Sequence, residues 1–239
     1  MTRNSFGLSI LFAIALCGCS GLGIDCVSGS GEPVRKTVAV PAFHGIELEG
    51  SVDVVIRKGA VQQVEVEGQK EVVDLLTTGV DDGIWNIEAS NCFSTDRPFT
   101  VFITIPEVDH IAVAGSGDVK ADSVFGAGET LLRIAGSGNI HASGLNEKRL
   151  IVHIQGSGDV EISGTAANFD AQVQGSGNIV ASPLSAAEAE VVIQGSGDAE
   201  LTAITRLNAT VQGSGNVRYH GKPQVVSRIE GSGAVVPAE

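Results

Sequence analysis

Basic residues are scarce in this sequence. Lys and Arg total 15 against 28 Asp and Glu, which gives a formal net charge of −13 over 239 residues. An acidic surface repels nucleic-acid phosphates and the anionic face of a membrane. We therefore expect no nucleic-acid partner.

Residues that hold metals or act as nucleophiles are also few. There are four cysteines, and no Cys-x-x-Cys or Cys/His spacing typical of zinc sites occurs. The histidines form no i, i+4 pair and have no nucleophile motif beside them; they are His44, His110, His141, His153 and His220. The sequence therefore predicts no cofactor, no metal site and no catalytic residue.

Only the first residues contain a long apolar run. Phe6 to Leu16 follows a single basic residue and is too short to span a bilayer as a permanent helix, which is typical of an export signal. It ends in Leu16-Cys17-Gly18-Cys19-Ser20, which resembles the bacterial lipobox, where a small residue precedes the cysteine that is lipidated after cleavage. We interpret residues 1–19 as a lipoprotein signal peptide and Cys19 as the lipid attachment site. The alternative is an ordinary secretory signal peptide.

The lipobox interpretation also predicts a location. Residues 20–34 are rich in Gly and Ser and would form a flexible tether between lipid and domain. Ser20 stands where the lipobox resemblance implies that a residue other than Asp favours the outer membrane. We expect a lipid-anchored protein of the cell envelope, in the outer membrane if the host has one.

Two cysteines remain after the signal, Cys26 and Cys92. In an exported protein such a pair suggests a disulfide, which would close a loop of 66 residues and contribute roughly 4 kcal/mol to stability in the chain-entropy model. Nothing in the sequence shows that they meet. Two free thiols are the alternative.

A repeated word dominates the second half of the chain. Gly-Ser-Gly, followed in six of its seven copies by Asp or Asn, recurs at intervals of 18 to 21 residues. The copies begin at Gly115, Gly136, Gly156, Gly175, Gly195, Gly213 and Gly231. A period near 20 indicates a solenoid rather than independent hairpins.

The columns beside each word indicate strands that enter and leave a tight corner. Every copy has Val or Ile two residues upstream, from Val113 to Ile229, and apolar residues dominate the positions four upstream and four downstream. The position before each word is polar from Gln155 onward and should face outward. At roughly 3.3 Å per residue, each period would form one flattened or three-sided coil of about 66 Å around a thin core. The pattern predicts a parallel β-helix over residues 111–239.

The residue after each corner alternates between acid and amide. The column reads Asp118, Asn139, Asp159, Asn178, Asp198 and Asn216, and ends with Ala234. Stacked carboxylates about 4.8 Å apart would repel, whereas an interposed carboxamide offers N–H donors and separates the charges. We interpret the column as a structural ladder. Weak surface binding of calcium by its Asp residues is the alternative.

Residues 35–110 are strand-like but irregular. Gly50-Ser51 resembles the later corners, and Glu71 to Thr77 suggests a short helix. Five of the eight aromatic residues after the signal fall here: Phe43, Trp85, Phe93, Phe99 and Phe102. We interpret this segment as an N-terminal β-rich cap with the first coils, because a solenoid needs its end covered. An aromatic binding cleft is the alternative.

Three segments of the sequence resemble the putative auto-transporter adhesin, head GIN domain family. They are the segment from Phe43 to Val55, the strand from Thr100 to Pro106 and the Gly-Ser-Gly series. The resemblance covers most of residues 35–235. It implies an all-β, right-handed parallel β-helix on a secreted or lipid-anchored envelope protein. It implies no enzymatic activity and supplies no catalytic residues.

The expected function is therefore a non-enzymatic, adhesin-like binding or structural module with an unidentified protein or glycan partner. Polysaccharide lyases and hydrolases also use β-helices, but such an enzyme needs a cleft with converging acids and bases. The even intervals leave almost no inserted loops to build one. The only compact candidate group is Asp122, Glu147, Lys148 and Arg149. A carbohydrate-active enzyme and an envelope-integrity or self-assembly element remain the alternatives.

Overall fold

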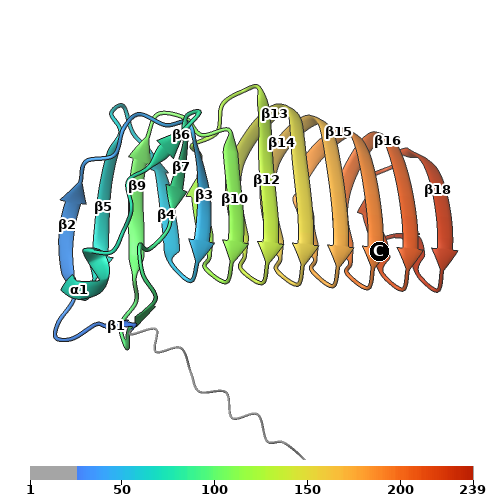
Figure 1. The fold of residues 1–239 in the computed structure, drawn as a ribbon. Helices are drawn as coiled ribbons and strands as arrows, with labels where there is room; N and C mark the ends of the chain where they lie inside the picture. Colours follow the sequence, from blue (N-terminus) through green and yellow to red (C-terminus); the bar gives the residue numbers. More distant parts are fainter. Residues whose placement is uncertain (1–25, 239) are drawn as a thin grey trace, which may run out of the picture.

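The chain folds into a right-handed parallel β-helix with a small cap at one end (Figure 1). The structure is a computed structural model and describes residues 26–238. Cys19 and the signal segment lie outside the described residues. Within residues 26–238, no helix has the length and apolar character needed to cross a membrane.

The described elements are almost all strands. Before the solenoid proper they are β1 (Val27–Ser28), β2 (Val34–Val38), β3 (Gly45–Gly50), β4 (Asp53–Lys58), β5 (Gln63–Gly68), α1 (Lys70–Val73), β6 (Val80–Asp81), β7 (Ile84–Ile87), β8 (Phe93–Ser94) and β9 (Thr100–Ile105). The coils then follow as β10 (His110–Gly115), β11 (Val119–Asp122), β12 (Glu129–Gly136), β13 (Ile140–Gly156), β14 (Val160–Gly175), β15 (Ile179–Gly195), β16 (Ala199–Gly213), β17 (Asn216–His220), β18 (Gln224–Gly231) and β19 (Ala234–Pro237).

Each Gly-Ser-Gly word turns the chain between two sides of the coil, and equivalent residues of successive coils pair in parallel. The strands that enter the corners run β3, β10, β12, β13, β14, β15, β16 and β18, side by side along the rod (Figure 1). Gly50 pairs with Gly115, so the sequence's Gly50-Ser51 forms the first corner of this row. The solenoid therefore begins before the regular repeat does.

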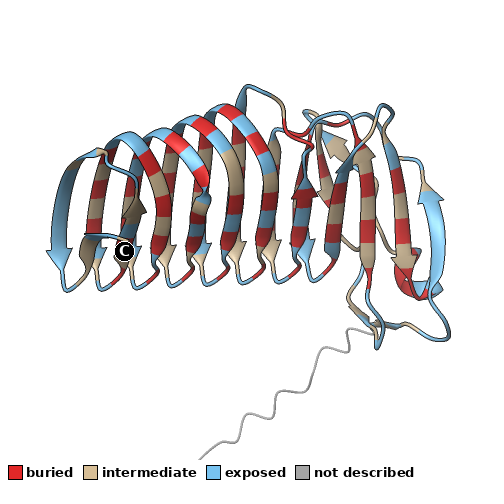
Figure 2. Ribbon diagram, turned by 180° about the vertical axis from the view of Figure 1, so that it is seen from behind, coloured by how far each residue is buried: buried red, intermediate tan, exposed pale blue. Residues whose placement is uncertain are grey.

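The apolar columns form the core, as their spacing predicts. Alternate residues along most strands are buried, whereas β2 and β18 near the two ends are largely exposed (Figure 2). The column two residues before each corner is 0–1% exposed from Val113 to Val211. Its last member, Ile229, is 44% exposed because no coil of the described chain packs on it. At 25 cal/mol per Å² or so of buried apolar surface, this stack of aliphatic side chains is the main source of stability.

The cap departs from the parallel pattern. β2 pairs antiparallel with β5, and β5 pairs antiparallel with β9, which joins the solenoid through β4. Phe43, Trp85 and Phe99 are buried, with Phe43 and Trp85 rings 5.4 Å apart. These three aromatic side chains therefore fill the interior and do not line a cleft.

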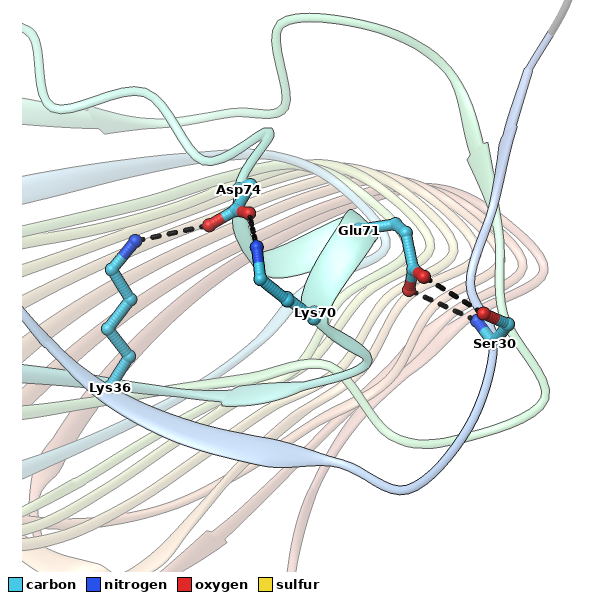
Figure 3. A network of polar contacts seen from close by, with 5 residues as sticks. All are labelled: Ser30, Lys36, Lys70, Glu71 and Asp74. Atoms are coloured by element: carbon cyan, nitrogen blue, oxygen red, sulfur yellow. Dashed lines mark hydrogen bonds and ion pairs between the residues drawn. The ribbon is translucent and has the colours of Figure 1, made fainter.

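The helix of the cap is shorter than the sequence indicates. α1 ends at Val73 because the chain then pairs elsewhere: the N–H of Thr77 donates to the carbonyl of Glu88 at 2.9 Å. Polar contacts hold α1 to the segments beside it (Figure 3). Asp74 Oδ1 lies 3.1 Å from Lys36 Nζ, and Ser30 Oγ donates to Glu71 at 2.9 Å. These contacts are exposed, so each adds little stability.

Candidate binding groove

The corners explain why both glycines recur. In each coil the carbonyl of the first glycine accepts hydrogen bonds from the Ser and second-Gly N–H groups of the next coil, as Gly136 does from Ser157 and Gly158. A Cβ at Gly156 would collide with the carbonyl oxygen of Gly136, and Gly156 also has φ of 138°. Only glycine therefore allows neighbouring corners to approach this closely.

The Asp/Asn column stacks beside these corners. The Oδ1 of each residue from Asp118 to Asp198 accepts the backbone N–H of its counterpart in the next coil, at 2.7–3.0 Å. Each Asn in addition donates its side-chain amide to the preceding Asp, as Asn139 does to Asp118 at 2.8 Å. Each of Asp118, Asp159 and Asp198 therefore receives two hydrogen bonds from the following coil, and no two of these three carboxylates are adjacent.

Sequence reasoning missed the first rung of this ladder. Asp53 follows Gly50 at the same offset as Asp118 follows Gly115, and its Oδ1 accepts the Asp118 N–H at 3.1 Å. The offset could have revealed the Asp53 rung, but Val52 stands where the later copies have their second glycine, so residues 50–53 do not match the repeated Gly-Ser-Gly word. Within residues 26–238, no cluster of three or more His, Cys, Asp or Glu side chains could hold a metal ion. The geometry of the column is that of a hydrogen-bonded structural ladder.

A groove of about 470 Å³ lies on the side of the coils that follows the corners. One wall is an outward column on three adjacent strands, Lys120 on β11, His141 on β13 and Glu161 on β14. Ser143, Ser163 and Pro183 line the groove where β13, β14 and β15 shift register. The size lies within the usual range for small-ligand sites, roughly 300–1,000 Å³.

The groove combines donors, acceptors and small apolar surfaces. His141 Nδ1 lies 3.0 Å from Glu161 Oε2, and the Ser143 hydroxyl donates to Asp122 at 2.7 Å. The hydroxyl groups of Ser143 and Ser123 hold the pKa of the Asp122 carboxyl below its usual value. The lining thus offers an ammonium, an imidazole–carboxylate pair and hydroxyl groups. Such a surface can bind polar groups.

The structure does not bring the four candidate catalytic residues together. Arg149 pairs with Asp170 at 2.7 Å, and Lys148 is exposed. Glu147 points inward and is 5% exposed. Within the described chain, no hydrogen bond or ion pair joins any two of Asp122, Glu147, Lys148 and Arg149.

Glu147 is unusual in its own right. Its counterparts in the following coils are Ala166, Ala186 and Ala203. Among the described residues, neither its carboxylate oxygens nor the buried Thr130 hydroxyl has a hydrogen-bond partner. Burial therefore raises the pKa of the Glu147 carboxyl, although the nearby Thr130 hydroxyl and the backbone groups of Gly128 and Asn146 oppose this rise in part.

The other histidines are dispersed. His44 contacts Asp109 at 2.7 Å, which raises the His44 pKa, and His220 contacts Glu200 at 2.9 Å, which lowers the Glu200 pKa. Burial lowers the pKa of His110. Asp109 influences both His44 and His110, but within residues 26–238 no cluster of three or more His, Cys, Asp or Glu side chains could hold a metal ion.

Cys26 and Cys92 form a disulfide with Cα atoms 4.7 Å apart. The bond lies beside the parallel pair of β1 and β8, so it joins the start of the described chain to the loop before Phe99. Both covalent and backbone contacts therefore fasten β1 to the cap.

Comparison with known proteins places these features in a family context. A family model described as putative auto-transporter adhesin, head GIN domain, matches residues 42–223. The fold is similar to that of a putative adhesin from Bacteroides fragilis, with a TM-score of 0.79, 25% identity and coverage of 89% of this chain and 100% of the other.

Two proteins from Parabacteroides distasonis are also similar. A putative lipid binding protein has a TM-score of 0.72 and 25% identity, covering 89% of this chain and 99% of its own. A putative adhesin has a TM-score of 0.66 and 24% identity, covering 90% of this chain and 100% of its own. A comparison with curated proteins found no match.

Proposed function

The chain belongs to the putative auto-transporter adhesin, head GIN domain family, and from this premise we propose that it is a non-enzymatic lipoprotein of the cell envelope that binds a glycan or protein partner. Cys19 carries the lipid, and residues 20–34 link it to the β-helix. In a host with an outer membrane, that membrane is the proposed location.

The observation that supports binding is the groove lined by Lys120, His141 and Glu161. Smaller hollows lie on another outward face of the coils, around His153. The groove at Lys120 differs from them in having serine hydroxyls and a proline beside its cationic and anionic groups. Hydroxyl-rich glycans and polar protein surfaces both present the hydrogen-bonding groups that such a lining can satisfy.

The absence of convergent acid–base groups within the described residues supports a binding role over catalysis. The carboxylates at the groove are already paired, Glu161 with His141 and Asp122 with serine hydroxyls. Most glycoside hydrolases use two carboxyl groups that flank the scissile bond.

The test is binding of residues 20–239, which contain every element of the described fold, to immobilised glycans and envelope proteins. Lys120→Ala with His141→Ala should weaken binding at least tenfold. The matched control is Arg133→Ala with His153→Ala, which removes the same residue classes from adjacent strands on another outward face, where they line a hollow of about 260 Å³. This control should bind normally. Release of reducing ends from a bound polysaccharide, or equal binding by both double variants, would contradict the proposal.

A further inference from the structure

The two ends of the rod differ. The cap strands β2 and β5 cover the first coils, whereas the last coil has no cover in the described chain (Figures 1 and 2). β18 pairs with β16 along one edge, and β19 pairs with β17. No strand of residues 26–238 pairs with their other edges, which leaves backbone donors and acceptors free for a further strand.

The inward side chains of β18 are correspondingly uncovered. Register with β16 places Val225 over Leu207, Ser227 over Ala209 and Ile229 over Val211. The three residues underneath are at most 2% exposed, whereas Ile229 is 44% exposed. The end of the rod therefore presents the upper surface of a core that lacks its next layer.

We propose that this end binds a second copy of the chain, tail to tail, through antiparallel pairing of β18 with β18 of the partner copy. A two-fold axis would relate the two copies, so each β18 strand would pair with an antiparallel copy of itself. Residue i of one copy then lies opposite residue j of the other, and the sum of i and j is the same for every pair. Both cores lie on the same side of the extended sheet only if inward residues of one copy lie opposite inward residues of the other. Because inward and outward residues alternate along β18, the axis must then pass through a residue and not between two residues.

The sequence of β18 selects the residue on that axis. An axis at Ser227 pairs seven residues: Val225 faces Ile229 of the second copy, Ser227 faces Ser227, and Gln224 faces Glu230. An axis at Arg228 would place two guanidinium groups opposite each other, which is unfavourable. An axis at Ile229 would leave fewer residues of the strand paired.

Charge and hydrogen-bonding complementarity support the Ser227 axis. The Gln224–Glu230 pair would repeat a contact already present in the sheet, where Gln212 donates to Glu230 at 3.1 Å. Arg228 would lie opposite Val226 and keeps its ion pair with Glu230 of its own chain. The new strand pair would thus continue the existing sheet and its outward polar column.

The arrangement extends the proposed function. Since the cap with β1 lies at one end of the rod and β18 at the other (Figure 1), molecules anchored through their N-termini to two facing membranes could pair at their distal ends. That consequence depends on the proposed lipid anchor, but dimerisation of residues 20–239 in solution does not.

The experiment is cysteine cross-linking of residues 20–239, in which Cys26 and Cys92 are already bonded to each other. Ser227→Cys would place two thiols opposite each other on the axis, with Cβ atoms about 5 Å apart, and should give a disulfide-linked dimer under mild oxidation. Val226→Cys is the matched control, because the axis places Arg228 opposite it. Cross-linking of Ser227→Cys no faster than Val226→Cys would overturn the proposal.

Sedimentation of the unmodified sequence provides a second measurement. We expect a monomer–dimer equilibrium that Ile229→Lys shifts to monomer, with unchanged binding by the groove. Monomer at every concentration, or pairing only with added peptide strands, would refute self-association. If the unmodified sequence dimerises but does not bind glycans or envelope proteins through the groove, only the proposed function is contradicted.

Discussion

Replacing both amides inside the ladder by acids should destabilise the β-helix. Asn139→Asp together with Asn178→Asp would create consecutive carboxylates from Asp53 to Asp198, since Asp53 and Asp118 are already neighbours in the ladder. Each change removes an amide donor that lies 2.8–2.9 Å from the preceding Asp oxygen. It also places a second negative charge beside that oxygen.

The magnitude follows from these contacts. At separations near 4 Å, repulsion between unit charges is about 1 kcal/mol in water and about 4 kcal/mol at an effective dielectric of 20. The ladder is exposed, so the lower part of that range applies. Including the lost hydrogen bonds, we expect the double variant to lose about 2–6 kcal/mol in its free energy of unfolding.

The pH dependence has a definite sign. Mutual repulsion raises the carboxyl pKa values of the variant above those of its unfolded chain. The folded variant therefore takes up protons first as the pH falls. Its deficit in stability should be present near neutral pH and shrink as the pH falls through the raised values toward about 4. High salt should relieve the charge repulsion but not replace the lost hydrogen bonds.

Denaturant midpoints at several pH and salt values make the measurement. Gln174→Glu is the matched control, because it makes the same amide-to-acid change in the neighbouring outward column, where Gln155 already donates to position 174. A double variant as stable as the control, or a deficit independent of pH, would refute the charge argument. A large rise in the melting temperature of the wild type with millimolar calcium would instead make the Asp column a metal site.

Three further predictions concern the core, the buried acid and the disulfide. Ile154→Asp should cost several kcal/mol and Gln174→Lys less than about 1 kcal/mol; similar denaturant midpoints would mean that the inward and outward columns are misassigned. Glu147→Ala should stabilise the fold near neutral pH by about 1–3 kcal/mol and have little effect at acidic pH. The pKa of Glu147 is higher in the folded than in the unfolded chain, so its ionisation destabilises the fold above the unfolded-state pKa. Thermal melts across pH test this, and a variant less stable than the wild type at neutral pH would contradict it. Cys92→Ser should lower stability by about 2–4 kcal/mol under non-reducing conditions, and a melting temperature equal to that of the wild type would show that the bond contributes nothing.

The coils could be predicted from the sequence because every coil repeats the same contacts. A column that is apolar in six successive coils can only face a shared interior, and its stacking sets the register. The charge argument for the ladder concerned only side chains. It did not include the backbone N–H bond that each Oδ1 accepts, or the rung at Asp53.

The groove could not be predicted from the columns. The corners stay in register, so the variation in coil length is absorbed elsewhere, at the register shifts after Ala142 and Glu161. Those shifts form the wall with Ser163 and Pro183. A single sequence shows the unequal intervals but not where the chain bulges. The burial of Glu147 could not be predicted either, because the alanine column that it begins becomes visible only with the pairing of the coils.

Adhesion by whole cells tests the central claim most directly. Cells that express the full chain should adhere to surfaces coated with the glycan or protein found by the binding screen, and Cys19→Ser should abolish both acylation of the N-terminal peptide and adhesion. Lys120→Ala with His141→Ala should keep acylation and lose adhesion, whereas Arg133→Ala with His153→Ala should keep both. Equal adhesion by cells that lack the protein, or full adhesion by the groove variant, would contradict a lipid-anchored binding module that acts through this groove.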